Sequence, residues 1–521
     1  LNQTKSDHFI SPRDPEYDEV AFNKKGSYTS GNGKDFSYDG DLTLSYGRVF
    51  REKHQVNAVL GTRMRSDESI SESNNSVGFP IGDFTRPSFS TGYSEGAKPV
   101  YSKYITRSNS FYFNGGYSFD NRYLLDANIR LDGASVFGTN KRYSETWAVG
   151  LAWNLHNENF MADWDWLERL KIRASIGNPG NQNFSAFQSY TTYAFNNWNR
   201  NTFGTSMIVS DFGNPNLEWQ KTLDKNIGFD LTLLENRLNV NFDYYNKSTD
   251  PLLASISVPS SVGVKAVMTN MGKQLIKGVS GTVKYAPVYR PQDRINWTLS
   301  FNFKHQKAEY RNIGNSLDQF NKENENKSLV RYYDGGSPTS LWAVRSLGIN
   351  PSDGREVFLT KEGDYTFEYN VKDEVIVGNS EPKLEGVIGS TFYYKGFSFS
   401  MYFRYSFGAD VFTKATYTKV ENISRGQLSY NQDKRALYER WQKPGDHAKF
   451  KAISLTESTP ISSRFVLREN YLKAESLSVG YDFDSEAIQK LGIQSLRLQA
   501  NTTDLFRISS ITEERGIEYP F

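Results

Sequence analysis

The chain has 521 residues, no cysteine and a net charge of +2, with acidic and basic residues interspersed. It can therefore form neither disulfides nor thiolate metal sites, and it lacks the one-sign field of a nucleic-acid partner. Aromatic residues make up 15% of it, yet its mean hydropathy of −0.62 is that of a hydrophilic protein. A membrane β-barrel reconciles the two, because only alternate residues in a thin band face lipid. No stretch approaches the ~20 apolar residues of a spanning helix.

Alternation of apolar and polar residues predicts about 14 strands in about seven antiparallel hairpins. It is clearest at 147–155, where Trp147, Val149, Leu151 and Trp153 are separated by small or polar residues. In chain order the expected pairs are 42–46 with 56–60, 111–119 with 123–131, 147–155 with 170–176, 223–233 with 238–244, 279–285 with 295–303, 388–394 with 397–407, and 477–483 with 496–500.

Most turns within these hairpins are short, such as Asp120-Asn121 and Lys395-Gly396, whose residues tolerate positive φ. Two longer ones, 164–170 and 485–491, are each expected to hold a helical turn. The connections between hairpins are long and polar, at 66–103, 132–143, 177–218, 246–276, 306–383 and 408–470. This sorting by length is typical of periplasmic turns and extracellular loops.

A soluble β-sandwich or propeller also alternates. Its strands are shorter than the nine to eleven residues, roughly, that a tilted membrane strand needs. Its loops are not sorted by length in this way. The predicted fold is therefore an all-β, antiparallel, up-and-down transmembrane barrel.

The direction of the strands predicts which parts of the barrel the chain holds. If the short turns are periplasmic, residues 1–35 and 505–521 belong to extracellular loops, and an odd number of strands is missing at each end, since single-chain barrels have even strand numbers and periplasmic termini. Plugged barrels have about 22 strands. We expect residues 1–521 to be the C-terminal part of such a barrel, without plug, early strands or last strand, and its opening at Leu1 without an apolar signal region indicates processing or truncation.

Several motifs in order resemble the SusC/RagA family of TonB-dependent outer-membrane transporters. The segment from Arg130 through Asp132, Gly133 and Phe137 to Gly138 is similar to the family's R-x-D-G-S-S-x-F-G, with Ala134 in place of the first serine. The segment from Gly177 through Asn178, Gly180 and Asn181 to Gln182 matches G-N-x-G-N-Q. Further matches are Asn214-Pro215-Asn216-Leu217, Asn226-Ile227-Gly228, Asp243-Tyr244-Tyr245 and Asn501 to Phe506.

The resemblance implies energised import of oligosaccharides, or of peptides in some members, across the outer membrane of a Gram-negative, Bacteroidetes-type bacterium. It also implies a SusD-like surface lipoprotein and the TonB, ExbB and ExbD machinery, which would act on a plug that this chain lacks. No cofactor is implied. From the residues alone, Gly133, Gly177 and Gly180 are expected to mark bends where strands meet loops.

Enzymatic chemistry finds little support. Gly92 to Gly96 fits G-x-S-x-G, but no strand precedes it and no helix follows, as a nucleophile elbow requires. The five histidines are dispersed without metal-ligand spacing. We therefore expect neither an enzyme nor a metal protein.

One loop is a candidate ligand contact. Tyr190, Tyr193, Phe195, Trp198 and Phe203 are interspersed with asparagines at 196, 197, 199 and 201, so aromatic faces could stack on sugar rings while amides bind hydroxyls. Packing of the loop on itself, or on the lipoprotein, is the simpler interpretation. A passive porin and a soluble all-β glycan-binding protein remain alternatives to the transporter.

Overall fold

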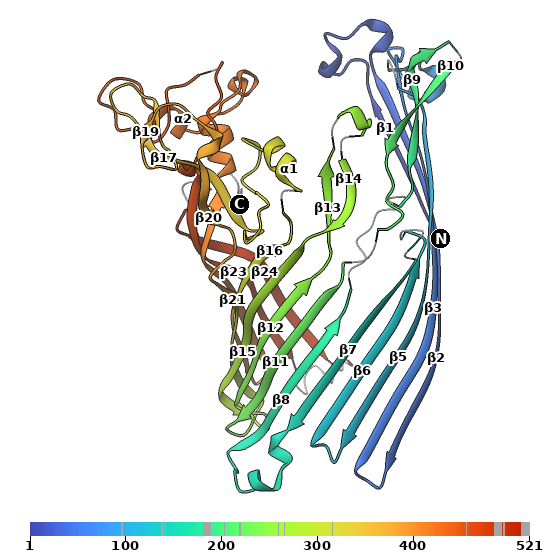
Figure 1. The fold of residues 1–521 in the computed structure, drawn as a ribbon, viewed down its shortest axis with the longest axis vertical. Helices are drawn as coiled ribbons and strands as arrows, with labels where there is room; N and C mark the ends of the chain where they lie inside the picture. Colours follow the sequence, from blue (N-terminus) through green and yellow to red (C-terminus); the bar gives the residue numbers. More distant parts are fainter. Residues whose placement is uncertain are drawn as a thin grey trace.

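The structure is a computed structural model, and it describes residues 1–94, 97–136, 140, 142–180, 189–202, 204–217, 220–258, 260–264, 266–314, 316–454, 456–483, 492 and 495–511. One 16-stranded antiparallel sheet curves into a wall (Figure 1). Its strands in spatial order are β1 (Asn2–Ile10), β2 (Ser27–Phe50), β3 (His54–Val77), β5 (Val100–Phe119), β6 (Tyr123–Ala134), β7 (Tyr143–Asn154), β8 (Leu167–Asn178), β11 (Thr222–Leu233), β12 (Leu238–Thr249), β15 (Lys273–Arg290), β16 (Ile295–Arg311), β21 (Leu384–Tyr394), β22 (Phe397–Phe412), β23 (Val466–Phe483) and β24 (Leu496–Ser509). The short β4 (Gly92–Tyr93) pairs beside β3.

This sheet confirms the all-β antiparallel architecture and every one of the seven expected hairpin pairings. Within the described residues the sheet does not close, and β1 and β24 are its two edges. Connections at one end of the wall are short and those at the other are long. We call these the short-turn end and the long-loop end.

The strands are longer and more numerous than expected. Residues 1–35, expected to belong to an extracellular loop, contain regular structure, since β1 pairs with 27–35 of β2 beyond the apolar band. The count of about 14 strands misses β1 and β4. β2 and β3 are 24 residues each, paired without a bulge. Beyond the apolar band both faces of these strands are polar, so alternation of hydrophobicity disappears although backbone pairing continues.

The short turns follow the expected chemistry. Asp120 and Asn121 have φ of 52° and 53°, and Lys395 and Gly396 have 46° and 101°, as two-residue hairpin turns require. The helical turn expected at 164–170 is wrong: 3-10 turns lie earlier, at Leu155–Asn157 and Asn159–Met161. The other expected helical turn, 485–491, lies outside the described residues.

The long connections contain secondary structure of their own. The link 177–218 holds the hairpin of β9 (Thr192–Asn201) and β10 (Gly204–Asp211), and 246–276 holds β13 (Leu252–Ser257) paired with β14 (Ala266–Met271). Both hairpins project from the long-loop end (Figure 1).

Residues 312–383 and 413–465 fold together into a unit that we call the cap (Figure 1). It contains a four-stranded sheet, ordered β19 (Tyr365–Thr366), β18 (Glu356–Leu359), β17 (Ser340–Ile349) and β20 (Glu374–Asn379), with the short helices α1 (Asp318–Glu323) and α2 (Arg435–Tyr438). Buried clusters around Phe465 and Ala343 share the neighbours Phe412 and Tyr417. The cap therefore has a hydrophobic core of its own, which packs against the wall at Phe412, the end of β22, and at Val466, the start of β23. Among the described residues no helix is both long and apolar enough to cross a membrane.

Candidate functional site

The two faces of the wall differ sharply. On β2, Leu42 and Leu44 are 73% and 72% exposed, and Leu60 on the neighbouring strand is 57% exposed on the same face. Equivalent apolar side chains continue along the wall, including Ile129, Leu151, Ile227 and Ile388. Exposed leucine and isoleucine in a continuous band are costly in water but stable in lipid. This face is therefore the lipid-facing one.

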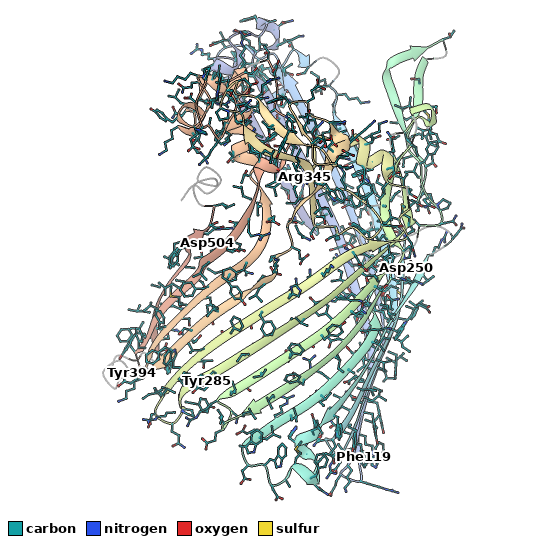
Figure 2. All side chains as sticks on the ribbon, turned by 60° about the vertical axis from the view of Figure 1, so that its left-hand side comes forward. Phe119, Asp250, Tyr285, Arg345, Tyr394 and Asp504 are labelled. Carbon is teal, nitrogen blue, oxygen red and sulfur yellow. The ribbon has the colours of Figure 1, made fainter. Side chains whose placement is uncertain are left out.

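Aromatic rings border the band at the short-turn end. His54, Phe119, Tyr123 and Trp153 contact in sequence across four strands, with centroid separations of 5.0, 6.4 and 6.1 Å. Phe119, Tyr285 and Tyr394 all lie at this end (Figure 2). Such a row is typical of the aromatic girdle at a membrane interface.

The opposite, lumenal face is lined by paired charges. Arg130 Nε donates to both oxygens of Asp132, at 2.7 and 2.8 Å, while Ser110 bonds both residues. Asp132 is only 5% exposed. The arginine and aspartate of the family-like motif thus neutralise each other on the wall, where a buried carboxylate needs such a partner.

Similar groups recur around the lumenal face. Arg173 on β8 donates to both oxygens of Asp243, at 2.6 and 2.8 Å, and to Asp230 at 3.3 Å. Arg63 pairs with Asp39, and Tyr112 donates to Asp41 at 3.0 Å. A polar wall of compensated charges suits a hydrated passage for polar solutes.

The expected bend glycines lie at strand ends, as predicted, but only Gly180 has a positive φ, of 64°. A Cβ on Gly133 would meet the Tyr143 ring at 2.5 Å, and one on Gly177 would lie 2.7 Å from the Ala148 Cβ. These two glycines allow close packing between strands rather than a turn. Asn178 accepts a hydrogen bond from the Thr222 backbone at 3.1 Å, whereas Phe137, Asn181 and Gln182 lie outside the described residues.

The candidate ligand residues are separated by the fold. Tyr193 and Phe195 alternate on β9 and are 61% and 70% exposed, beside Met207 of β10. Tyr190 lies before this hairpin in the chain, and it lines a pocket together with Tyr38 and Tyr143 of the wall. Trp198 lies on β9, but its side chain is outside the described ones. The structure therefore brings Tyr193 and Phe195 together and leaves Tyr190 elsewhere.

Sequence reasoning missed a pocket of about 390 Å³ in the cap. Arg331, of which 2% of the side chain is exposed, binds Glu374 at 2.7 Å on one wall, and the Trp342 ring lies 5.1 Å from Tyr333 on another. The buried indole Nε1 of Trp342 has no hydrogen-bond partner among the described residues. Burial raises the pKa of Glu374 although Arg331 opposes the shift.

A buried ion cluster joins the two segments of the cap. Arg464 binds Glu356 and Glu421, each at 3.0 Å, and these carboxylates are 1% and 0% exposed. Ser462 and Thr459 donate to the same carboxylates. Burial alone would lower the pKa of Arg464, but the two carboxylates outweigh it and raise that pKa. No sequence signal predicts this cluster, because its members are about 40 to 110 residues apart.

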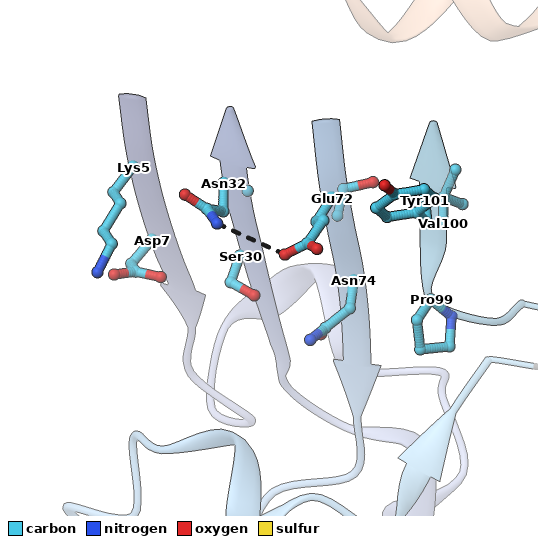
Figure 3. Close-up of a pocket in the computed structure, with 11 residues that line it drawn as sticks. Lys5, Asp7, Ser30, Asn32, Glu72, Asn74, Pro99, Val100 and Tyr101 are labelled. Carbon is cyan, nitrogen blue, oxygen red and sulfur yellow. Dashed lines mark hydrogen bonds between the residues drawn. The ribbon is translucent and has the colours of Figure 1, made fainter. Parts of the chain in front are cut away.

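A third pocket, of about 520 Å³, lies on the extension of β1, β2 and β3 beyond the band (Figure 3). Lys5, Asp7, Asn32 and Glu72 line it, and Asn32 donates to Glu72 at 3.5 Å. These are mixed charges without a nucleophile–base arrangement. Within the described part of the chain no cluster of His, Asp or Glu is placed to hold a metal ion.

The comparisons agree with this geometry. Residues 3–348, well over half of the chain, match the model of the family described as TonB dependent receptor-like, beta-barrel. The TonB-dependent receptor P39 of Formosa agariphila is 25% identical over 91% of this chain and 49% of its own length. The TonB-dependent receptor SusC of Bacteroides thetaiotaomicron is 25% identical over 73% of this chain and 38% of its own length.

The structure of the RagAB peptide transporter matches with a TM-score of 0.84 at 21% identity, covering 98% of this chain and 55% of that chain. The chain spans about half the length, or less, of these relatives. The chain belongs to the family of TonB-dependent receptor-like β-barrels.

Proposed function

We propose that the whole protein is an outer-membrane transporter that imports large polar nutrients by TonB-dependent gating, and that this chain supplies barrel wall and extracellular loops. The observation that carries the proposal is the two-sided wall, with an apolar face for lipid and a lumenal face of neutralised charges. Unpaired strand edges cannot face hydrocarbon. We therefore propose that further strands of the whole protein close the sheet between β24 and β1, and that a plug fills the lumen.

Oligosaccharides are the substrate class we favour. Tyr193 and Phe195 project from the β9–β10 hairpin with more than half of each side chain exposed, and flat aromatic faces stack on sugar rings. The cap pocket adds the Trp342–Tyr333 pair and an unpartnered indole N–H. Peptides are the second candidate. A SusD-like lipoprotein would close over the long-loop end, and TonB with ExbB and ExbD would act through the plug.

The test is uptake of fluorescent oligosaccharides and peptides by Bacteroidetes-type cells that carry or lack the full-length protein. We expect oligosaccharide uptake that a protonophore abolishes and that Tyr193→Ala with Phe195→Ala reduces. The matched control is Tyr365→Ala, which removes an even more exposed aromatic residue, 76% exposed, from the cap. Uptake that persists with the protonophore would instead identify a passive porin, and uptake of peptides alone would contradict the substrate class.

A further inference from the structure

A pocket of about 500 Å³ opens beside the lipid-facing band, on its long-loop side. Tyr38 on β2, Arg107 on β5, Tyr143 on β7 and Tyr190 before β9 contribute to its walls, together with Arg142. It combines aromatic rings with cationic groups, and none of its described lining residues carries a carboxylate.

Strand register fixes the face and height of this pocket. Asn109 pairs with Gly133, which pairs with Tyr143, and Phe111, two residues further on, is an exposed member of the apolar band. Because alternate residues share a face, Arg107 lies on the lipid-facing side, about 13 Å along the strand from Phe111. The apolar band of a membrane barrel is about 25 Å tall. If the band of this wall starts at the aromatic girdle, it therefore ends near Asn109. Arg107 therefore lies at the level of lipid headgroups.

Both arginines are available to an anion. Neither Arg107 nor Arg142 forms an ion pair with any described residue, whereas neighbouring Arg65 binds Asp67 at 2.7 Å. The backbone of Arg107 is fixed by Ser135, which accepts from its N–H at 3.0 Å and donates to its carbonyl at 2.8 Å. The position of Arg107 is thus set, while its guanidinium has no ion-pair partner among the residues that the structure describes.

We propose that this pocket binds the phosphorylated sugar headgroup of lipid A, the membrane anchor of lipopolysaccharide, in the outer leaflet. Arg107 pairs with the phosphate, for which the guanidinium fork is well shaped. Arg142, one residue before Tyr143 and so on the other side of the strand, lines the same pocket and adds a second positive charge. Tyr38 and Tyr143 pack against the glucosamine rings and upper acyl chains, as interfacial tyrosines do. A soluble anion would meet the same cations, but the pocket opens beside the hydrocarbon band. The inference rests on the proposed orientation, in which the long-loop end is extracellular.

The test uses full-length protein purified from outer membranes, with bound lipid quantified by mass spectrometry. We expect co-purified lipid A, reduced about tenfold in the Arg107→Ala, Arg142→Ala double variant. Arg48→Ala is the matched control, because Arg48 is a cation on the same strand face at the short-turn end. It should leave the amount unchanged. Stripped protein should rebind phosphorylated lipid A in micelles about tenfold more tightly than the dephosphorylated form, and millimolar inorganic phosphate should not compete.

Several outcomes overturn the proposal. Equal lipid A on both proteins, or equal binding of dephosphorylated lipid A, removes the role of the arginines. Competition by inorganic phosphate identifies a free-anion site instead. A change of oligomeric state in the double variant at unchanged lipid content identifies a barrel–barrel contact. Arginine-dependent binding of phospholipid rather than lipid A shows that the pocket faces the inner leaflet, so that the orientation, and with it the proposed function, fails.

Discussion

Arg464 is the residue at which the two segments of the cap meet, with Glu356 from one and Glu421 from the other. We predict that Arg464→Met destabilises the cap by about 3–5 kcal/mol, because two buried carboxylates lose their shared cation. Hydrogen exchange of residues 413–454 in the full-length protein measures this as loss of protection.

Arg468→Met is the control for that change, since Arg468 is 59% exposed and binds Asp410 at 3.2 Å. Its partner Asp410 is 13% exposed but keeps a hydrogen bond from the Asn379 backbone N–H when the arginine is removed, so this pair is expected to contribute about 1 kcal/mol or less. Adding Glu421→Gln to Arg464→Met should restore part of the protection, because one uncompensated charge is removed. Equal exchange in Arg464→Met and Arg468→Met would contradict the structural role of the cluster.

Two carboxylates in cap segment 413–465, Asp433 and Asp446, allow us to predict how this segment responds to acid. Hydrogen bonds from the Arg435 side chain hold the pKa of Asp433 below its ordinary value, and backbone N–H groups of Lys443 and Gln442 do the same for Asp446. A carboxyl with a lowered folded pKa stabilises the fold above the ordinary pKa of about 3.9, and this contribution is lost as pH falls through the lowered value.

We therefore predict that exchange protection of residues 433–446, corrected for intrinsic rates, falls below about pH 4. Asp433→Asn should be less protected at neutral pH and less sensitive to acid. The pH dependence of Glu374 has the opposite sign. Burial raises its pKa, so its contribution to the stability of the fold is present below its ordinary pKa and is lost as pH rises. Acid-induced loosening around Glu374 but not around Asp433 would contradict these assignments.

At the scale of elements, the spacing of β7 and β8 depends on a glycine. A Cβ on Gly177 would meet the Ala148 Cβ at 2.7 Å and the Trp147 carbonyl at 2.8 Å, whereas one on Gly150, in the same strand pair, would meet nothing closer than 4.0 Å. We predict that Gly177→Ala destabilises the wall by about 1–3 kcal/mol and that Gly150→Ala leaves it nearly unchanged. Urea-unfolding midpoints of the full-length protein in lipid measure the difference. Equal midpoints for the two variants would contradict the packing between these strands.

The sequence predicts those elements whose signals are local. Every expected hairpin pairing in the lipid-facing band is present, because lipid on one side and water on the other impose alternation. The turn at Asp120-Asn121 is likewise predictable, since its residues accept positive φ.

The rest depends on contacts that a single sequence does not display. β1 pairs with a stretch of β2 that is polar on both faces, so its alternation is hidden. The β9–β10 hairpin could have been predicted from the sequence, because Tyr193 and Phe195 alternate opposite Met207 and Val209. The cap could not have been predicted, because its two segments are separated in the chain by β21 and β22 and meet only through tertiary contacts with Phe412 and Tyr417. The same holds for the candidate site. The family-like motif in the sequence points to Arg130 and Asp132, but the sequence predicts neither the cap pocket nor the Arg464 cluster, whose residues are brought together only by the fold.

At the scale of the whole molecule, the two ends of the wall differ in structure. The short-turn end carries the short turns and the aromatic girdle, and the long-loop end carries the cap and both projecting hairpins, as Figures 1 and 2 show. A transporter that captures large solutes outside the cell needs its recognition elements on one side only. The placement of the cap and both projecting hairpins at the long-loop end fits this requirement, whereas the β7–β8 connection at the other end holds only two 3-10 turns.

The claim that the wall spans the outer membrane with the cap outside is tested most directly by cysteine labelling in intact cells, because this chain contains no cysteine. Two full-length variants are compared: Tyr365→Cys in the cap, where Tyr365 is 76% exposed, and Glu235→Cys in a short turn, where the Glu235 side chain is 86% exposed. The parent protein controls for any other cysteine. We predict that a membrane-impermeant maleimide labels Tyr365→Cys in intact cells and Glu235→Cys only after the outer membrane is permeabilised. Labelling of both positions in intact cells, or of Glu235→Cys alone, would contradict the account.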